Sequence, residues 1–135
     1  MKGGQISVDG SLSSQVLTGL LMASPMASSD VTILVDNLIS IPYVQLTIDM
    51  MRKFGVDVEN INNSEFRIKA PQRYKPCKYN VEGDWSGAAF LLVAGAIAGE
   101  VEVMNLNPRS LQADRAIINA LMWCGAYVSI RENSI

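Results

Sequence analysis

Residues 1–55 alternate between two spacings of apolar side chains. A two-residue period predicts strands at 6–8 and 31–35, and a helical period predicts helices at 16–21 and 44–51. Gly55 ends the second helix, because glycine favours the conformation that terminates helices. The pattern therefore predicts two successive strand-to-helix steps.

Two further strands are predicted at 56–58 and 66–68, on either side of the turn residues 62–64. Asparagine and serine favour such turns, so this stretch has the pattern of a hairpin. The predicted order over residues 1–70 is βαβαββ.

The same order restarts after residues 71–78. The second set comprises strands at 79–82, 101–103 and 126–130, and helices at 88–97 and 117–122.

Landmarks of the two halves match at nearly constant separation. Val31 matches Val101, Gly55 matches Gly125 and Val58 matches Val128 at an offset of 70, while Val8-Asp9-Gly10 matches Val81-Glu82-Gly83 at an offset of 73. Internal duplication explains this agreement, and chance similarity of apolar patterns is the alternative. The fold class is therefore α/β with repeated βαβαββ units, one complete in 1–70 and one, βαβαβ, in 79–135, joined by a linker at 71–78. A counterpart of 66–70 would need residues beyond Ile135, so we expect a longer parent protein.

Composition narrows the classes of function. The chain of 135 residues is 49% hydrophobic and 18% charged with a net charge of −2, which is typical of a globular protein and gives no overall attraction to nucleic acid or anionic membranes. The absence of histidine excludes His-based nucleophile activation and His metal sites, and Cys77 and Cys124 form no metal-binding pair. The apolar run 88–98 is too short to span a bilayer. We expect a cytoplasmic protein with neither metal nor cofactor.

The stretch Ser11-Leu12-Ser13-Ser14-Gln15 precedes a predicted helix. Hydroxyl and amide groups at a helix N-terminus donate hydrogen bonds to anions, although serines there also act as simple caps. No Lys or Arg lies between Lys2 and Arg52, so a phosphate bound here requires cations from elsewhere.

Several stretches resemble, in order and spacing, the middle of the 5-enolpyruvylshikimate-3-phosphate synthase family. They are Gly10-Ser11-Leu12-Ser13-Ser14-Gln15, Leu20-Leu21-Met22-Ala23, Ser40-Ile41-Pro42-Tyr43, Phe54-Gly55-Val56 and Val81-Glu82-Gly83-Asp84. The resemblance implies two lobes of βαβαββ units that close on shikimate 3-phosphate and phosphoenolpyruvate. It places 1–70 in the first lobe and 79–135 in the second, and it implies transfer of the enolpyruvyl group to the 5-hydroxyl with loss of phosphate, a step of aromatic amino acid biosynthesis.

The resemblance also implies site residues. Ser13, Ser14 and Gln15 would contact shikimate 3-phosphate, with Gln15 close to phosphoenolpyruvate as well. Ser40 would add a phosphate contact and Tyr43 would lie along the shikimate ring. The sequence itself places Ser40 at a helix start, since a proline follows two residues later.

The chain departs from the family pattern at Ile41, where lysine is common, at Trp85 and Gly87, and at Ala113, where glycine is usual. We interpret Asp84 as structural. The family's catalytic aspartate and its Lys and Arg clusters come from segments outside residues 1–135, so we identify no catalytic residue. We expect this chain alone to be inactive and to bind shikimate 3-phosphate at millimolar level or weaker.

Two other functions stay open. The sibling transferase acting on UDP-N-acetylglucosamine shares the fold and chemistry, although the hydroxyl-rich segment argues against it. A non-catalytic interaction module is the second, because the helix at 88–97 is apolar all round and favours self-association of a shortened chain. We expect the parent protein to be monomeric.

Overall fold

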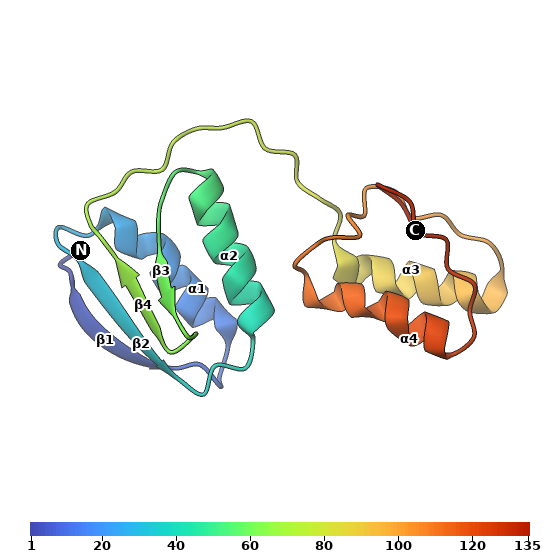
Figure 1. The fold of residues 1–135 in the computed structure, drawn as a ribbon, viewed down its shortest axis with the longest axis horizontal. Coiled ribbons are helices and arrows are strands. Elements are labelled where there is room, and N and C mark those ends of the chain that lie inside the picture. Colours follow the sequence, from blue (N-terminus) through green and yellow to red (C-terminus); the bar gives the residue numbers. More distant parts are fainter. The chain divides into compact units, whose positions relative to one another are not determined.

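A computed structural model describes residues 1–135 as two compact units, Met1–Lys78 and Tyr79–Ile135 (Figure 1). Each unit has its own apolar core. None of the helices has the length and apolar character needed to cross a membrane.

The first unit has the predicted βαβαββ order. Its elements are β1 (Gly4–Asp9), α1 (Ser14–Ala23), a short 3-10 turn (Ser24–Met26), β2 (Val31–Asp36), α2 (Ile41–Lys53), β3 (Glu59–Ile61) and β4 (Glu65–Ile68). The third strand differs from its predicted position at 56–58. Val56 and Val58 are buried, but the hydrogen-bonded ladder forms with the residues that follow them. The buried residues Val56 and Val58 therefore precede the strand, and the strand pairing is made by Glu59–Ile61.

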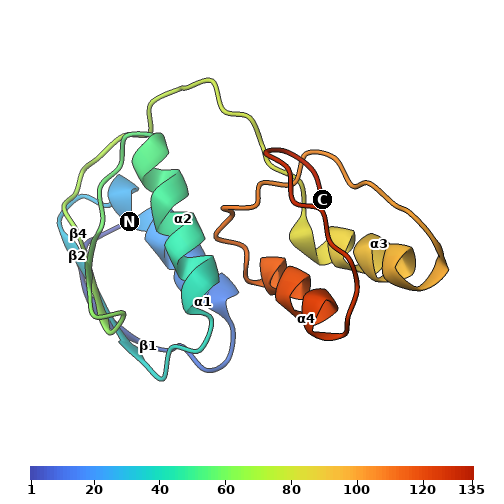
Figure 2. The ribbon, with the colours of Figure 1, turned by 45° about the vertical axis from the view of Figure 1, so that its right-hand side comes forward.

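The four strands form one sheet in the order β1-β2-β4-β3. β1 and β2 are parallel, and β4 runs antiparallel to both of its neighbours. α1 and α2 lie on the same face of this sheet (Figure 2). Val31, Ile33 and Val35 alternate toward that face and are buried with Phe66 and Ile68 against both helices. Burial of this single face explains the two-residue period seen in the sequence.

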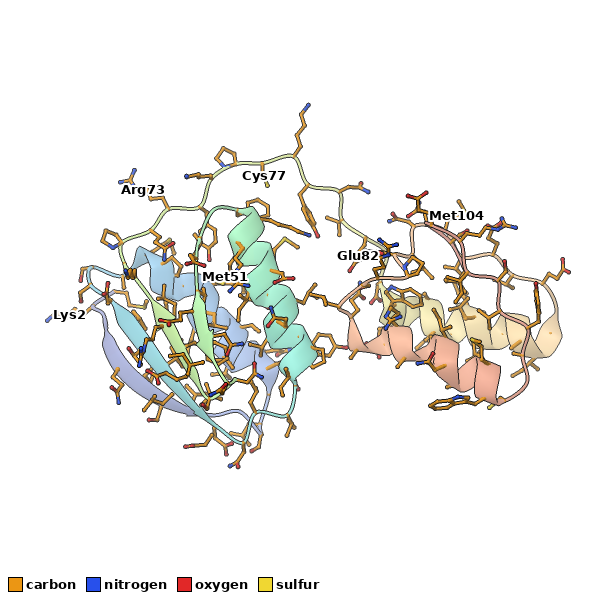
Figure 3. All side chains as sticks on the ribbon, viewed as in Figure 1. Lys2, Met51, Arg73, Cys77, Glu82 and Met104 are labelled. Carbon is orange, nitrogen blue, oxygen red and sulfur yellow. The ribbon has the colours of Figure 1, made fainter.

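Part of the predicted linker belongs to the first unit. The backbone N–H of Gln72 donates to the carbonyl of Pro25 at 2.7 Å, and the Tyr74 hydroxyl donates to the carbonyl of Met22 at 2.8 Å. Arg73 and Cys77 lie along the same segment (Figure 3). These hydrogen bonds attach Gln72 and Tyr74, which follow β4, to the first unit.

The second unit contains α3 (Trp85–Ala98), a 3-10 turn (Ala113–Ala116) and α4 (Ile117–Trp123). The strands predicted at 79–82, 101–103 and 126–130 are absent. Only an isolated antiparallel bridge, between Met104 and Ser134, is present. Apolar alternation alone does not make a strand, because each strand needs a hydrogen-bonded neighbour along its length.

The two predicted helix stops share one backbone geometry. Gly55 follows α2 with φ of 78°, and Gly125 follows α4 with φ of 87°. At each helix end, the N–H of the glycine donates to the carbonyl of the residue three positions earlier. The N–H of the residue after the glycine donates to the carbonyl of the residue five positions before it. These hydrogen bonds are 2.9–3.0 Å long. This is the Schellman arrangement, which favours glycine because of the left-handed φ. Its recurrence at an offset of 70 supports the internal duplication.

Candidate functional site

Both helices of the first unit begin at the same edge of the sheet. β1 and β2 are parallel neighbours, and their last residues, Asp9 and Asp36, are paired across the ladder. Residues 10–13 then lead into α1, and residues 37–40 lead into α2. Parallel strands therefore bring the two hydroxyl-containing helix starts to one place.

Gly10 allows the two connecting loops to approach closely. Its N–H donates to the carbonyl of Asp36 at 2.7 Å. A Cβ on Gly10 would lie 2.9 Å from the Cα of Leu38 and 2.9 Å from a methyl carbon of Val35. Only glycine fits such a contact without moving the backbone, so the first residue of the hydroxyl-rich motif has a steric role.

Ser13 is the N-cap of α1. Its backbone is extended, with φ of −169°, and its Oγ accepts a hydrogen bond from the amide of Gln15 at 3.1 Å. The hydroxyl hydrogen remains able to donate to another acceptor. Ser13 and Ser14 are half-buried and Gln15 is exposed. Capping and ligand contact are thus compatible at this helix start.

Ser40 and Tyr43 occupy the start of α2. Ser40 is the N-cap residue, but its side chain makes no capping hydrogen bond, and Pro42 lies in the first turn as predicted. Tyr43, the third residue of α2, is 39% exposed. The Ser40 hydroxyl is therefore not used to close its own helix.

The electrostatics of this edge are unfavourable for an anion. Asp9 and Asp36 are both exposed there, and the Ser11 N–H that donates to Asp9 at 2.9 Å lowers the pKa of Asp9 below its ordinary value. Lys2 lies before β1 (Figure 3), and Arg52 and Lys53 lie in the last turn of α2. These cations, the nearest along the chain, therefore lie at the start of β1 and at the end of α2, whereas the candidate site lies at the end of β1 and at the start of α2.

The β3–β4 turn is a further component of this edge, which the sequence interpretation did not place. β4 is antiparallel to β2, and the Val35 N–H donates to the carbonyl of Ser64 at 2.8 Å. Asn62 and Asn63, both with positive φ, form the turn. The turn itself was readable from the sequence, but its location required knowing that β4 pairs with β2.

The start of α3 supports the structural interpretation of Asp84. Its carboxylate accepts hydrogen bonds from the amides of Ser86 at 3.1 Å and Gly87 at 2.9 Å, which makes it the N-cap. The next residue, Trp85, is fully buried and anchors the second core. The departures from the family pattern at Trp85 and Gly87 are therefore accommodated by packing and capping.

The βαβαββ order of the first unit, the glycine helix stop that recurs in the second unit and the hydroxyl-rich start of α1 define the chain as an α/β protein. The family model described as EPSP synthase (3-phosphoshikimate 1-carboxyvinyltransferase) matches residues 1–135, and the chain belongs to this family.

Curated relatives carry the same name. The chain is 47% identical over 131 residues to a 3-phosphoshikimate 1-carboxyvinyltransferase of Actinobacillus pleuropneumoniae, covering 96% of this chain and 30% of the relative. It is 45% identical over 137 residues to that of Haemophilus influenzae, covering 100% of this chain and 32% of the relative. The Pasteurella multocida protein is 45% identical over 131 residues, with 96% and 30% covered. The chain thus spans about 30% of the length of these relatives.

Proposed function

We propose that this chain supplies part of the shikimate 3-phosphate site of a 3-phosphoshikimate 1-carboxyvinyltransferase. That enzyme moves the enolpyruvyl group of phosphoenolpyruvate to the 5-hydroxyl of shikimate 3-phosphate. The observation that carries the proposal is the convergence of two helix starts, with Ser13, Ser14 and Ser40, at one sheet edge of a chain that belongs to this family.

The roles of the residues follow from their groups. Ser13, Ser14 and Ser40 donate hydroxyl hydrogens to the phosphate, and the two helix N-termini add partial positive charge. Gln15 is exposed beside them and reaches both shikimate 3-phosphate and phosphoenolpyruvate, while Tyr43 lies along the shikimate ring. Residues 1–70 belong to one lobe and 79–135 to the other.

This site is a partial one. Neutral hydrogen bonds supply about 1 kcal/mol each, so three or four of them give a dissociation constant no tighter than about millimolar. Asp9 and Asp36 oppose the phosphate charge, and the site has no paired cation. The acid, the base and the phosphate-clamping Lys and Arg groups of the reaction therefore come from other parts of the enzyme, and residues 1–135 alone do not catalyse it.

The proposal also includes a cytoplasmic location and a monomeric parent enzyme. Cys77 and Cys124 are exposed free thiols, which fits a reducing compartment.

Titration of the isotope-labelled chain with shikimate 3-phosphate, followed by amide chemical shifts, tests the site. We expect shifts confined to residues 11–15 and 37–43, with half-saturation at millimolar concentration or above. Ser14→Ala should weaken binding several-fold, whereas Ser28→Ala, an exposed serine before β2, should not.

Two outcomes would count against the proposal. Shifts that spare residues 11–15 at tens of millimolar ligand would remove the site, and stronger binding of UDP-N-acetylglucosamine would favour the sibling transferase.

A further inference from the structure

A carboxylate network joins two segments of the second unit. The Glu82 carboxylate accepts a hydrogen bond from the Ser110 hydroxyl at 2.6 Å and another from the side-chain amide of Gln112 at 3.1 Å. Ser110 is 7% exposed, and Glu82 and Gln112 are half-buried. The two donors follow Glu82 by 28 and 30 positions in the sequence. Hydroxyl and amide hydrogen bonds thus hold a carboxylate between distant segments.

Gln112 is itself held in place by the surrounding backbone. Its side-chain nitrogen also donates to the carbonyl of Gly83 at 2.9 Å, and its side-chain oxygen accepts the Trp85 N–H at 2.9 Å. Its backbone N–H donates to the Ser110 hydroxyl oxygen at 3.0 Å. The donors that face Glu82 are therefore fixed before any anion binds to them.

The internal repeat places this network at the counterpart of the candidate phosphate site. Glu82 corresponds to Asp9 at the offset of 73, and Ser110 corresponds to Ser40 at the offset of 70. Their interactions differ, because Asp9 accepts the Ser11 N–H and Ser40 makes no capping hydrogen bond. The glutamate side chain is longer by one methylene group and contacts the serine of its own unit. The same edge is thus closed by a carboxylate in the second unit.

The glycine contact of this edge is also repeated. The Gly83 N–H donates to the carbonyl of Asn105 at 2.7 Å, as the Gly10 N–H donates to that of Asp36 at 2.7 Å. A Cβ on Gly83 would lie 2.7 Å from the Asn105 carbonyl oxygen. Both edges therefore depend on a close approach that only glycine permits.

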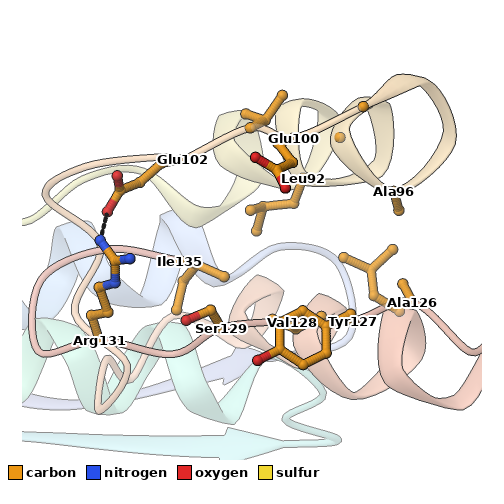
Figure 4. A pocket seen from close by; sticks show the side chains of 14 residues that line it. Leu92, Ala96, Glu100, Glu102, Ala126, Tyr127, Val128, Ser129, Arg131 and Ile135 are labelled. Carbon is orange, nitrogen blue, oxygen red and sulfur yellow. Dashed lines mark hydrogen bonds and ion pairs between the residues drawn. The ribbon is translucent and has the colours of Figure 1, made fainter.

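Two other glutamates of the second unit have different surroundings. Glu100 and Glu102 line the pocket shown in Figure 4, and both are exposed. Glu102 pairs with the Arg131 guanidinium at 2.8 Å. A carboxylate that is partly removed from water, as Glu82 is, needs hydrogen bonds to its oxygens in place of hydration. The Glu82 position is therefore a built anion site rather than a surface ion pair.

We propose that Glu82 is the internal ligand of an anion site formed by Ser110 and Gln112, and that this site takes a small carboxylate such as formate when the Glu82 carboxylate is removed. In the unmodified chain the occupied site ties the segment before α3 to the segment before the 3-10 turn at 113–116. The inference concerns the second unit alone, so it stands or fails separately from the shikimate 3-phosphate site.

Rescue of Glu82→Ala by sodium formate tests the site. Trp85 and Trp123, the two tryptophans of the chain, both belong to the second unit, so their fluorescence during urea unfolding reports this unit. Glu82→Ala leaves the buried Ser110 hydroxyl without its acceptor and should lower the urea midpoint. Formate should restore at least about half of the loss, because a ligand of the folded state stabilises it. Sodium chloride at the same ionic strength should not.

Three variants show where formate acts. Glu100→Ala is the matched control, because it removes an exposed glutamate of the same unit, and formate should not affect it beyond the chloride effect. Glu82→Gln keeps a side chain of the same size in the site and should gain nothing from formate. Glu82→Ala combined with Ser110→Ala should not be rescued, because a donor is lost.

The outcomes are distinct. Where Glu82→Ala is unfolded without urea, rescue is read as the return of native tryptophan fluorescence on addition of formate. Absence of rescue would overturn the proposal. Equal stabilisation of Glu82→Ala and Glu100→Ala would show a general salt effect and overturn it as well, as would rescue that persists in the double variant.

Discussion

The amide nitrogen of Gly10 lies 2.7 Å from the carbonyl oxygen of Asp36, and this hydrogen bond joins the loop before α1 to the end of β2. It holds the starts of two helices side by side, although its partners are 26 positions apart in the sequence. The position of Ser13 relative to Ser40 depends on this contact and on the parallel pairing of β1 with β2.

Gly10→Ala should destabilise the first unit. The new Cβ would lie 2.9 Å from the Cα of Leu38, a backbone contact that cannot move cheaply, and we expect a loss of about 1–3 kcal/mol in the free energy of unfolding. Urea denaturation measures it. Gly19→Ala is the matched control, because a Cβ there meets nothing within 4 Å and alanine favours the helix. Equal effects of the two substitutions would contradict the steric role of Gly10.

Ser13→Ala and Ser40→Ala should differ in stability although both remove a serine hydroxyl at a helix start. Ser13 caps its helix, so its loss should cost about 1 kcal/mol. Ser40 makes no capping bond, so its loss should change the free energy of unfolding by less than about 0.5 kcal/mol. Thermal and urea unfolding of both variants give the comparison. A larger cost at Ser40 would assign that hydroxyl to the fold and weaken its proposed role toward phosphate.

Tyr74 should make the first unit sensitive to alkaline pH. Burial raises the pKa of Tyr74 above its ordinary value of 10.0, and its neutral hydroxyl donates to the carbonyl of Met22. Because the folded pKa is the higher one, this contribution is fully present below pH 10 and is lost as the pH rises through the folded value. The difference in urea midpoint between the unmodified chain and Tyr74→Phe should therefore shrink between pH 8 and pH 11. A constant difference would contradict the assignment.

Asp84→Ala should destabilise the second unit. Two amides at the start of α3 lose their acceptor, and we expect a cost of about 1–2 kcal/mol. Asp84→Asn keeps an acceptor oxygen and should retain most of the stability. Helical circular dichroism during urea unfolding separates the two variants. Equal losses would show that the negative charge, rather than the capping bonds, stabilises this helix.

The accuracy of the sequence prediction differed between the two units for a physical reason. In the first unit every strand has a partner and one sheet face is covered by helices, so apolar period and structure agree at Val31–Val35 and at Val44–Met51. In the second unit Val101 and Val103 have the same alternation but little pairing, because only Ile135 and Ser134 provide partners. Periodicity reports which side chains are buried, and it does not report whether a neighbouring strand is present.

The sequence by itself determined the helices, the glycine stops, the order of the first unit and the identity of the hydroxyl groups, because these depend on interactions between residues close along the chain. Only the tertiary structure decided that Ser13 and Ser40 share one edge with Asp9 and Asp36, and that residues 79–135 contain a single isolated bridge rather than a sheet. Those features depend on pairing between segments far apart in the chain, whose register is set by the burial of a common core.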